Sequence, residues 1–234
     1  MALTDEIQQR VQSIFQSRWT IRPGRVVPEP EDVGLRNDAV AFDSATVLYA
    51  DLAGSTRLVD AESRELAAEV YKSYLYAAAR IVNAEGGNVT AYDGDRIMAL
   101  FLGSSKNTSA ARCALKINCA VTQILNPALA QQYPASSYRI QQVVGIDTSP
   151  IMAARTGARG DNDLVWVGRA ANYAAKLTEL PPDCSSWITG DVYDGLHADL
   201  KLGGNPKRPM WEERVWTAMG GVRIFRSNWW WRLD

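Results

Sequence analysis

The sequence predicts an α+β fold with the element order β-α-β-β-α-β and helices on one face of the sheet. An apolar run at 46–50 indicates a buried strand, and a helical pattern follows it from 55 to 85. Asp93-Gly94 is a strong turn signal between two strand-like runs. A second helical pattern at 109–125 precedes a further strand at 138–147. This is the order of ferredoxin-like folds.

The first 41 residues are expected to lie outside this core. Residues 5–19 carry apolar side chains at helical spacing behind possible caps at Thr4 and Asp5, which predicts a short amphipathic helix. We expect its apolar stripe to pack on the domain or on a second copy of the chain. Residues 22–41 combine prolines and glycines with scattered charges, which predicts an irregular linker.

The core begins with the strand that ends at Asp51. The sequence then predicts a helix start at Gly54-Ser55-Thr56, with Ser55 or Thr56 as N-cap, and a helix end at Gly86-Gly87. Two strands, 88–92 and 96–101, form the hairpin around Asp93-Gly94.

Beyond residue 150 the pattern is less regular. Residues 151–164 are polar and predict a loop or an arm. Three tryptophans, Trp229 to Trp231, are too apolar to stay bare and are expected to pack against the domain or its twin. The other expected elements are strands at 164–168, 187–189 and 222–225 and a helix at 170–180 that Pro181-Pro182 ends.

Length and pattern together suit one sizeable domain with appendages. We expect an N-terminal helix and linker at 1–41, a catalytic domain at 42–190, and an extension at 191–234 that completes the domain with extra strands.

Composition excludes several classes of protein. The net charge of −1 gives no footprint for nucleic acid, and no apolar run approaches the length of a membrane span, so no stable membrane insertion is expected. Three cysteines without metal-like spacing fit a reduced, cytoplasmic chain. A single histidine, His197, makes a catalytic triad or a histidine-rich zinc site a poor match.

Two aspartates, Asp51 and Asp95, are candidate metal ligands at the ends of predicted strands. Asp51 ends the first core strand, and Asp95 lies just past the hairpin turn. If the two strands are neighbours, the carboxylates meet at one edge of the sheet and repel each other unless a divalent cation lies between them. The alternative to a metal site is that Asp51 is a helix-entry cap and Asp95 is a turn residue.

Three motifs in order resemble the class III nucleotidyl cyclases. They are Tyr49-Ala50-Asp51-Leu52-Ala53-Gly54-Ser55-Thr56, then Gly94-Asp95-Arg96-Ile97-Met98-Ala99-Leu100-Phe101, and then Gly168-Arg169-Ala170-Ala171-Asn172-Tyr173-Ala174-Ala175-Lys176-Leu177. The resemblance covers about residues 42–190. It implies cyclisation of a nucleoside triphosphate, in which the ribose 3′-oxygen attacks the α-phosphorus and pyrophosphate leaves.

The resemblance also implies a set of site residues. Asp51, Leu52 and Asp95 would hold two divalent cations, Mg²⁺ or Mn²⁺, since such hard ions prefer oxygen ligands. Asn172 would orient the ribose, and Lys176 would meet developing charge on the transferred phosphate. The family usually has arginine at the position of Lys176. The lysine ammonium would therefore make a single contact with the phosphate, where an arginine guanidinium would make a bidentate one.

In the family the acids and the Asn–basic pair come from different chains. A head-to-tail homodimer with two composite active sites is therefore implied. The turn into the first helix offers backbone N–H groups for the triphosphate. These belong to Ala53, Gly54, Ser55 and Thr56.

The base-reading positions depart from the purine cyclases. Ala91 and Val165 stand where those enzymes carry polar side chains. Tyr49 replaces a common phenylalanine, and Arg96 directly follows Asp95, so a phenol and a guanidinium adjoin the metal acids. A base with carbonyl acceptors would suit both. The combination resembles the bacterial Pycsar-type pyrimidine cyclases of anti-phage defence.

The expected activity is conversion of UTP to 3′,5′-cyclic UMP and pyrophosphate, a second messenger sensed by a separate effector protein. The alternatives are a cytidylate cyclase making cyclic CMP, an adenylate cyclase with unusual base readout, and a catalytically dead nucleotide-binding regulator. Tyr49 could also be a core aromatic residue, and Arg96 a phosphate or surface contact.

Overall fold

The structure, a computed structural model, describes residues 2–158 and 161–233. Contacts divide the chain into two compact units, a smaller and a larger one. The smaller unit is Met1–Ser44 with Pro150–Gly168, and the larger unit is Ala45–Ser149 with Arg169–Asp234.

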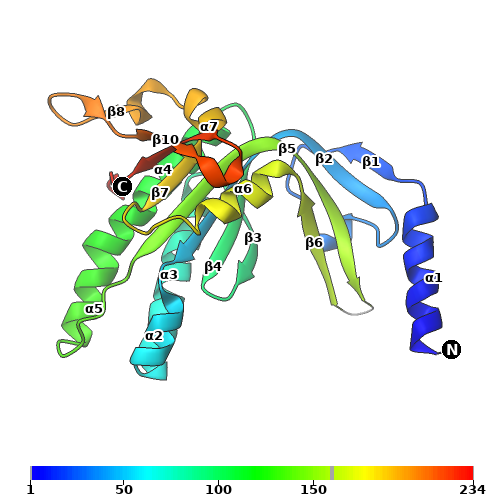
Figure 1. Cartoon of the computed structure of the whole chain (residues 1–234), viewed down its shortest axis with the longest axis horizontal. Helices are drawn as coiled ribbons and strands as arrows, with labels where there is room; N and C mark the ends of the chain where they lie inside the picture. Colours follow the sequence, from blue (N-terminus) through cyan, green and yellow to red (C-terminus); the bar gives the residue numbers. More distant parts are fainter. Residues whose placement is uncertain (1, 159–160, 234) are drawn as a thin grey trace. The chain divides into compact units, whose positions relative to one another are not determined.

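The larger unit is built on a sheet in which β2 lies between β5 and β4 (Figure 1). Its strands follow the order β10-β11-β7-β5-β2-β4-β3. The predicted β-α-β-β-α-β core is present, and β7, β10 and β11 extend it as expected for the C-terminal part. The strands are β2 (Asp38–Leu52), β3 (Asn88–Asp93), β4 (Arg96–Phe101), β5 (Gln142–Ala158), β7 (Ser186–Thr189), β10 (Glu212–Trp216) and β11 (Val222–Ser227). The larger unit holds β2 from Ala45 on and β5 as far as Ser149.

Two helices, α3 (Arg64–Ala84) and α4 (Lys106–Ala120), cover one face of this sheet. Alternate residues of β2, among them Leu48 and Ala50, are buried against Tyr74 and the apolar face of α3. Because successive side chains of a strand point to opposite faces, this leaves Tyr49 on the other side.

The opposite face is covered as well. Val143 packs with Leu177 of α6 (Arg169–Leu177), whereas its neighbour Val144 packs with the α3 and α4 side. The prediction of helices on one face is therefore incomplete, because α6 lies outside the six core elements and covers the second face. The short helix α7 (Gly190–Asp194) follows β7 directly.

Two predicted helices are interrupted in the structure. The pattern at 55–85 is two helices, α2 (Ser55–Ala61) and α3, because the Ser63 side chain accepts a hydrogen bond from the Leu66 N–H and caps a new start. The second pattern continues from α4 through a π-helical turn, Val121–Leu125, into α5 (Asn126–Gln132). Pro127 opens α5, and a widened turn accommodates its missing N–H.

In the smaller unit, the expected N-terminal helix is α1 (Leu3–Gln16), and none of its residues is buried. The expected packing of its stripe on the chain is not seen: Leu3, Ile7 and Val11 are 70%, 54% and 43% exposed. The expected linker also contains a strand, β1 (Thr20–Pro23), which pairs in parallel with the start of β2.

The expected loop at 151–164 is wrong. β5 runs on to Ala158 and pairs in antiparallel register with β6 (Asp161–Val167), as in Met152↔Val167 and Arg155↔Leu164. The pairing of the two strands satisfies the backbone of this polar, small-residue segment. Residues 159 and 160 of the same segment lie outside the described residues.

The C-terminal tail packs on the larger unit as expected. Trp229 and Trp231 lie against its core, and the Trp231 N–H donates to the Leu115 carbonyl at 3.1 Å. Trp230 is 44% exposed. Two short strands, β8 (Leu202–Gly203) and β9 (Arg208–Pro209), form a separate pair. No helix within residues 2–158 and 161–233 combines the length and apolarity that crossing a bilayer requires.

Candidate active site

The structure brings Asp51 and Asp95 together at one end of the central strands. β2 and β4 are antiparallel neighbours, with Asp51 opposite Arg96. The tight turn before Arg96 places Asp95 next to this pair, with Gly94 in the left-handed region at φ 61°. The hairpin predicted from Asp93-Gly94 therefore positions the second acid.

Electrostatics at this pair disfavour two bare carboxylates. Burial raises the pKa of Asp51 to about 6, and the charge of Asp95 adds to this effect. Arg96 and a hydrogen bond from Thr178 act in the opposite direction. One carboxylate oxygen of Asp95, Oδ2, is buried without a hydrogen-bond partner. A divalent cation between them would offset the repulsion and give the unpartnered oxygen of Asp95 a ligand partner.

The donor set fits a cation that keeps open coordination positions. No cluster of three or more His, Cys, Asp or Glu side chains suited to a metal occurs in the described part of the chain. The candidate protein ligands are thus the two carboxylates and the Leu52 carbonyl, all of them hard oxygen ligands. Mg²⁺ is commonly held by one or two carboxylates together with water and substrate phosphates.

The turn after Asp51 differs in two details from the prediction. The Ala53 N–H donates to the Gln141 carbonyl at 2.9 Å, so it is not available to a phosphate. The N-cap of α2 is Gly54 at φ 71°, and neither Ser55 nor Thr56 takes that place. A left-handed N-cap favours glycine, and space beside Gly54 is open. The candidate phosphate donors are therefore reduced to Gly54, Ser55 and Thr56.

Tyr49 and Arg96 lie together beside the acids. The Arg96 guanidinium lies 5.4 Å from the centre of the Tyr49 ring, within the range of a cation–π contact. Arg96 also forms an ion pair with Asp93 at 2.5 Å. The Tyr49 hydroxyl contacts Met98 Sδ at 3.1 Å, and burial raises the pKa of Tyr49.

Met98 was not anticipated. The registers Tyr49↔Met98 and Ala91↔Met98 place these three residues in one row across β2, β4 and β3. Ala91 is half-buried in this row. Alternation along β4 from Arg96 would have indicated Met98 as a residue of the same face. Val165, the other position at which the purine cyclases carry a polar base-reading side chain, is 42% exposed on β6 in the smaller unit.

Asn172 and Lys176 are both exposed on α6, four residues apart and so on one side of the helix. The charges acting on Asp51 come from Asp95 and Arg96, and Lys176 is not among them. The helix reaches Asp51 through Thr178 instead, whose hydroxyl lies 3.5 Å from Asp51 Oδ2. Asn172 and Lys176 are thus presented outward and not onto the acids of their own chain.

Two tyrosines with buried hydroxyls feel the charge of the acids. Tyr74 is fully buried, its hydroxyl has no hydrogen-bond partner, and the charges of Asp51 and Asp95 add to the effect of burial in raising its pKa. Tyr138 has an unpartnered buried hydroxyl too, and Asp95 adds to its raised pKa. The strand predicted at 138–147 begins only at Gln142, so Tyr138 lies in the segment before β5.

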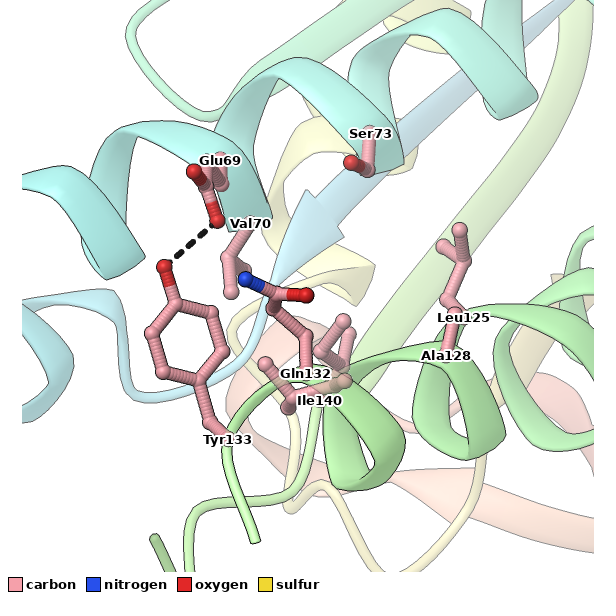
Figure 2. Close-up of a pocket in the computed structure, with 9 residues that line it drawn as sticks. Glu69, Val70, Ser73, Leu125, Ala128, Gln132, Tyr133 and Ile140 are labelled. Atoms are coloured by element: carbon pink, nitrogen blue, oxygen red, sulfur yellow. Dashed lines mark hydrogen bonds between the residues drawn. The ribbon is translucent and has the colours of Figure 1, made fainter.

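A separate hollow of about 170 Å³ lies between α3 and α5, where Glu69 accepts a hydrogen bond from the Tyr133 hydroxyl at 2.7 Å (Figure 2). None of its residues belongs to the predicted site. Its lining residues are Glu69, Val70, Ser73, Leu125, Ala128, Leu129, Gln132, Tyr133 and Ile140.

No family model matches the chain. Two curated proteins are similar to it over the full length of both chains: a uridylate cyclase of Xanthomonas perforans and one of Burkholderia cepacia, each 49% identical. Among solved structures, the adenylyl cyclase CyaB from P. aeruginosa matches with a TM-score of 0.67 at 18% identity. That match covers 81% of this chain and 95% of the other, and it shows a shared fold.

The full-length similarity, the shared cyclase fold and the paired acids agree. The chain belongs to the uridylate cyclase family of class III nucleotidyl cyclases.

Proposed function

We propose that this chain converts UTP to 3′,5′-cyclic UMP and pyrophosphate. The observation that carries the proposal is the pair of Asp51 and Asp95, brought together at a partly buried strand end beside Tyr49 and Arg96. The full-length similarity to proteins named uridylate cyclase supports the choice of substrate.

In the proposed reaction the two acids hold divalent cations, with the Leu52 carbonyl as a further ligand. Bound there, the cations would lower the pKa of the ribose 3′-hydroxyl and neutralise charge on the triphosphate. The protein's own residues would position the triphosphate and the ribose. The N–H groups at Gly54, Ser55 and Thr56 lie at a helix start, which suits them to hold phosphate oxygens.

The remaining groups are proposed to come from a second copy of the chain. Asn172 and Lys176 face outward, as groups that complete a partner's site must. Asn172 would fix the ribose so that its 3′-oxygen faces the α-phosphorus. Lys176 would meet the charge that develops on the transferred phosphate. A head-to-tail homodimer would then carry two such sites.

Base choice is proposed to rest on Arg96 and Tyr49. Uracil presents two carbonyl acceptors, and the Arg96 guanidinium and the Tyr49 phenol are donors that lie together beside the metal acids. Ala91 and Val165 offer no side-chain hydrogen bond to a purine edge. Cytosine keeps one of the two carbonyls, so it is expected to be the nearest competitor.

We further propose that cyclic UMP serves as a second messenger, sensed by a separate effector protein in anti-phage defence. The resemblance to Pycsar-type cyclases supports this role. Phage challenge of cells with the wild-type chain or with Asp51→Asn would test it: equal survival would contradict the role.

The reaction is tested by incubating purified protein with UTP and Mn²⁺ and identifying products by mass spectrometry. Equimolar cyclic UMP and pyrophosphate are expected, with no product from Asp51→Asn or Asp95→Asn. Release of UMP or UDP in place of a cyclic product, or unchanged turnover in both variants, would overturn the assignment.

A further inference from the structure

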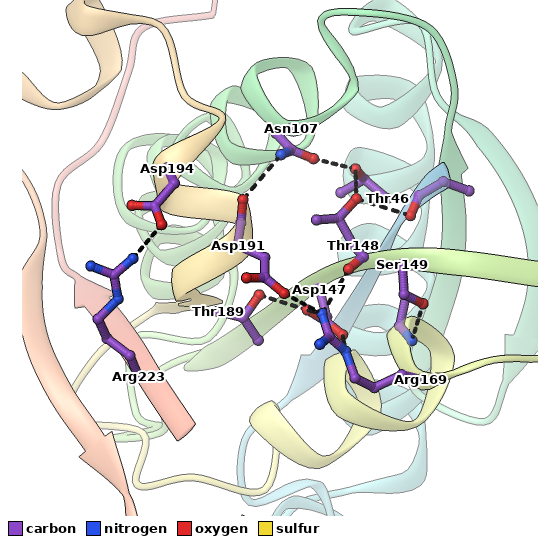
Figure 3. A network of polar contacts seen from close by, with 12 residues as sticks. Thr46, Asn107, Asp147, Thr148, Ser149, Arg169, Thr189, Asp191, Asp194 and Arg223 are labelled. Carbon is purple, nitrogen blue, oxygen red and sulfur yellow. Dashed lines mark hydrogen bonds and ion pairs between the residues drawn. The ribbon is translucent and has the colours of Figure 1, made fainter. Parts of the chain in front are cut away.

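Arg169, the first residue of α6, is held by a network of acids that sequence patterns did not indicate (Figure 3). Its Nε donates to Asp147 Oδ2 at 3.0 Å and its Nη2 to Asp147 Oδ1 at 3.2 Å. The same Nη2 also donates to the Thr148 carbonyl at 2.8 Å and to Asp191 Oδ2 at 2.5 Å. The guanidinium is therefore fixed from two sides.

Asp147 holds the Arg169 guanidinium in place, and its own side chain is completely buried. A buried carboxylate is tolerated when it is paired and hydrogen-bonded, and Arg169 supplies both conditions in forked geometry. The Thr189 hydroxyl donates to Asp147 Oδ1 at 2.6 Å. Asp191 is tied in from the other side, because its backbone carbonyl accepts from Asn107 Nδ2 at 3.4 Å.

The rest of α6 is fixed as well. The Ala170 N–H donates to the Ser149 hydroxyl at 2.9 Å, which satisfies a free donor at the helix start. In the middle, a Cβ on Gly145 would lie 2.1 Å from the Ala174 carbonyl oxygen, so the helix lies directly on β5. At the end, Thr178 contacts Asp51. These contacts leave α6 little freedom to rotate or slide.

We propose that Arg169 is a positioning residue for the half of the active site that α6 presents to a second copy of the chain. Held by Asp147 and Asp191, it sets the direction in which Asn172 and Lys176 point. It does not touch the nucleotide. This inference rests on the proposed composite site, in which the acids of one chain meet α6 of the other.

Kinetics of single variants test the positioning role. Arg169→Gln is expected to lower kcat at least tenfold and the affinity for Mn²⁺ by a much smaller factor, because α6 reaches the metal acids of its own chain through the long 3.5 Å contact of Thr178. Arg169→Lys keeps the charge but lacks the fork, and should recover part of kcat. A loss of Mn²⁺ affinity that parallels the loss of kcat would overturn the proposal.

Arg223 offers a matched control. It forms an ion pair with Asp194 between β11 and α7, on the wall of the same surface hollow as Arg169. Asp194 lies on α7 like Asp191, but within the described residues its side chain pairs with Arg223 and not with Arg169. Arg223→Gln should keep kcat within twofold of wild type, and an equal loss in Arg223→Gln and Arg169→Gln would mean that general surface charge, and not the position of α6, is responsible.

Mixed dimers identify the half on which Arg169 acts. Arg169→Gln mixed with Asp51→Asn should regain activity, because one site then combines intact acids with an intact α6. Arg169→Gln mixed with Lys176→Ala should stay inactive, because both changes affect the α6 half. The reverse pattern, or equal results in both mixtures from folded proteins, would overturn the proposal. If Arg169→Gln melts below the assay temperature, Arg169→Lys takes its place in both mixtures.

A reference mixture separates this inference from the function on which it rests. Asp51→Asn mixed with Lys176→Ala should regain activity without any change at Arg169. Failure of that mixture, with wild type making cyclic UMP, would remove the composite site and with it the role of Arg169. Success there, with failure of Arg169→Gln to complement Asp51→Asn, would overturn the role of Arg169 alone.

Discussion

Asp51 is a residue in electrostatic conflict with its surroundings. Its pKa in the folded chain is about 6, against 3.8 for an aspartate in an unfolded chain, because burial and Asp95 both oppose its ionisation. Between these two values the folded state binds more protons than the unfolded state. The free energy of unfolding therefore falls as pH rises through this window, and the contribution of protonated Asp51 is lost above pH 6.

Replacing Asp51 by Asn is expected to stabilise the metal-free protein at pH 7.5 while abolishing cyclisation. After discounting for solvent screening, the expected gain is about 1 kcal/mol. Thermal unfolding in EDTA measures it, and the gain should vanish near pH 4. Mn²⁺ should then raise the Tm of wild type but not of the variant. A variant that melts below wild type at pH 7.5 would contradict the conflict inferred here.

Arg96 is expected to contribute to the preference for UTP over ATP. Arg96→Lys keeps a charge but loses the planar fork, so the ratio of kcat/KM for UTP over that for ATP should fall about tenfold, the loss expected for one charged hydrogen bond. Asp93→Asn is the control, since it removes only the ion-pair partner of Arg96 and should keep the preference. An unchanged preference in Arg96→Lys would assign base choice elsewhere.

Among the helices and strands, α6 is the element whose position should matter most for turnover, and its close packing on β5 sets that position. Gly145→Ala should push the helix away from the strand, because the new Cβ would meet the Ala174 carbonyl oxygen. Overpacking of this kind costs about 1–3 kcal/mol. We expect a lower Tm and a larger fractional loss of kcat than of Mn²⁺ affinity. Wild-type kcat in a variant with lowered Tm would show that the position of α6 does not matter.

Local signals predicted elements well where the chain itself supplies the geometry. The turn at Asp93-Gly94 fixed the β3–β4 hairpin, and strand alternation with this hairpin was enough to bring Asp51, Asp95 and Arg96 together. A strand at 164–168 was predicted and is part of β6, but the continuation of β5 through 151–158 and its pairing with β6 were missed. The polar, small residues of this segment carry little strand preference and are held by the pairing itself.

The arginine network shows the same limit within the site. Arg169 and Asp147 are 22 positions apart, and a tertiary contact between α6 and β5 joins them. Neither periodicity nor a motif marks such a pair. Thr178 was missed for the same reason, since only the packing of α6 brings its hydroxyl to Asp51.

At the scale of the whole molecule, the account requires two chains for each site. Asp95→Ala should abolish turnover but leave the mass of the dimer unchanged, because the acids face the nucleotide and are not proposed to hold the chains together. Native mass spectrometry or light scattering checks the mass. A monomeric variant would mean that the acids also stabilise the dimer, and a monomeric, active wild type would remove the composite site.

One site is proposed to carry out cyclisation and to select uracil. The most direct test offers the wild-type protein all four nucleoside triphosphates at equal concentration with Mn²⁺ and quantifies the cyclic products by mass spectrometry. We expect cyclic UMP as the dominant product, with cyclic CMP next and all products lost in Asp95→Asn. Cyclic AMP as the dominant product would contradict it.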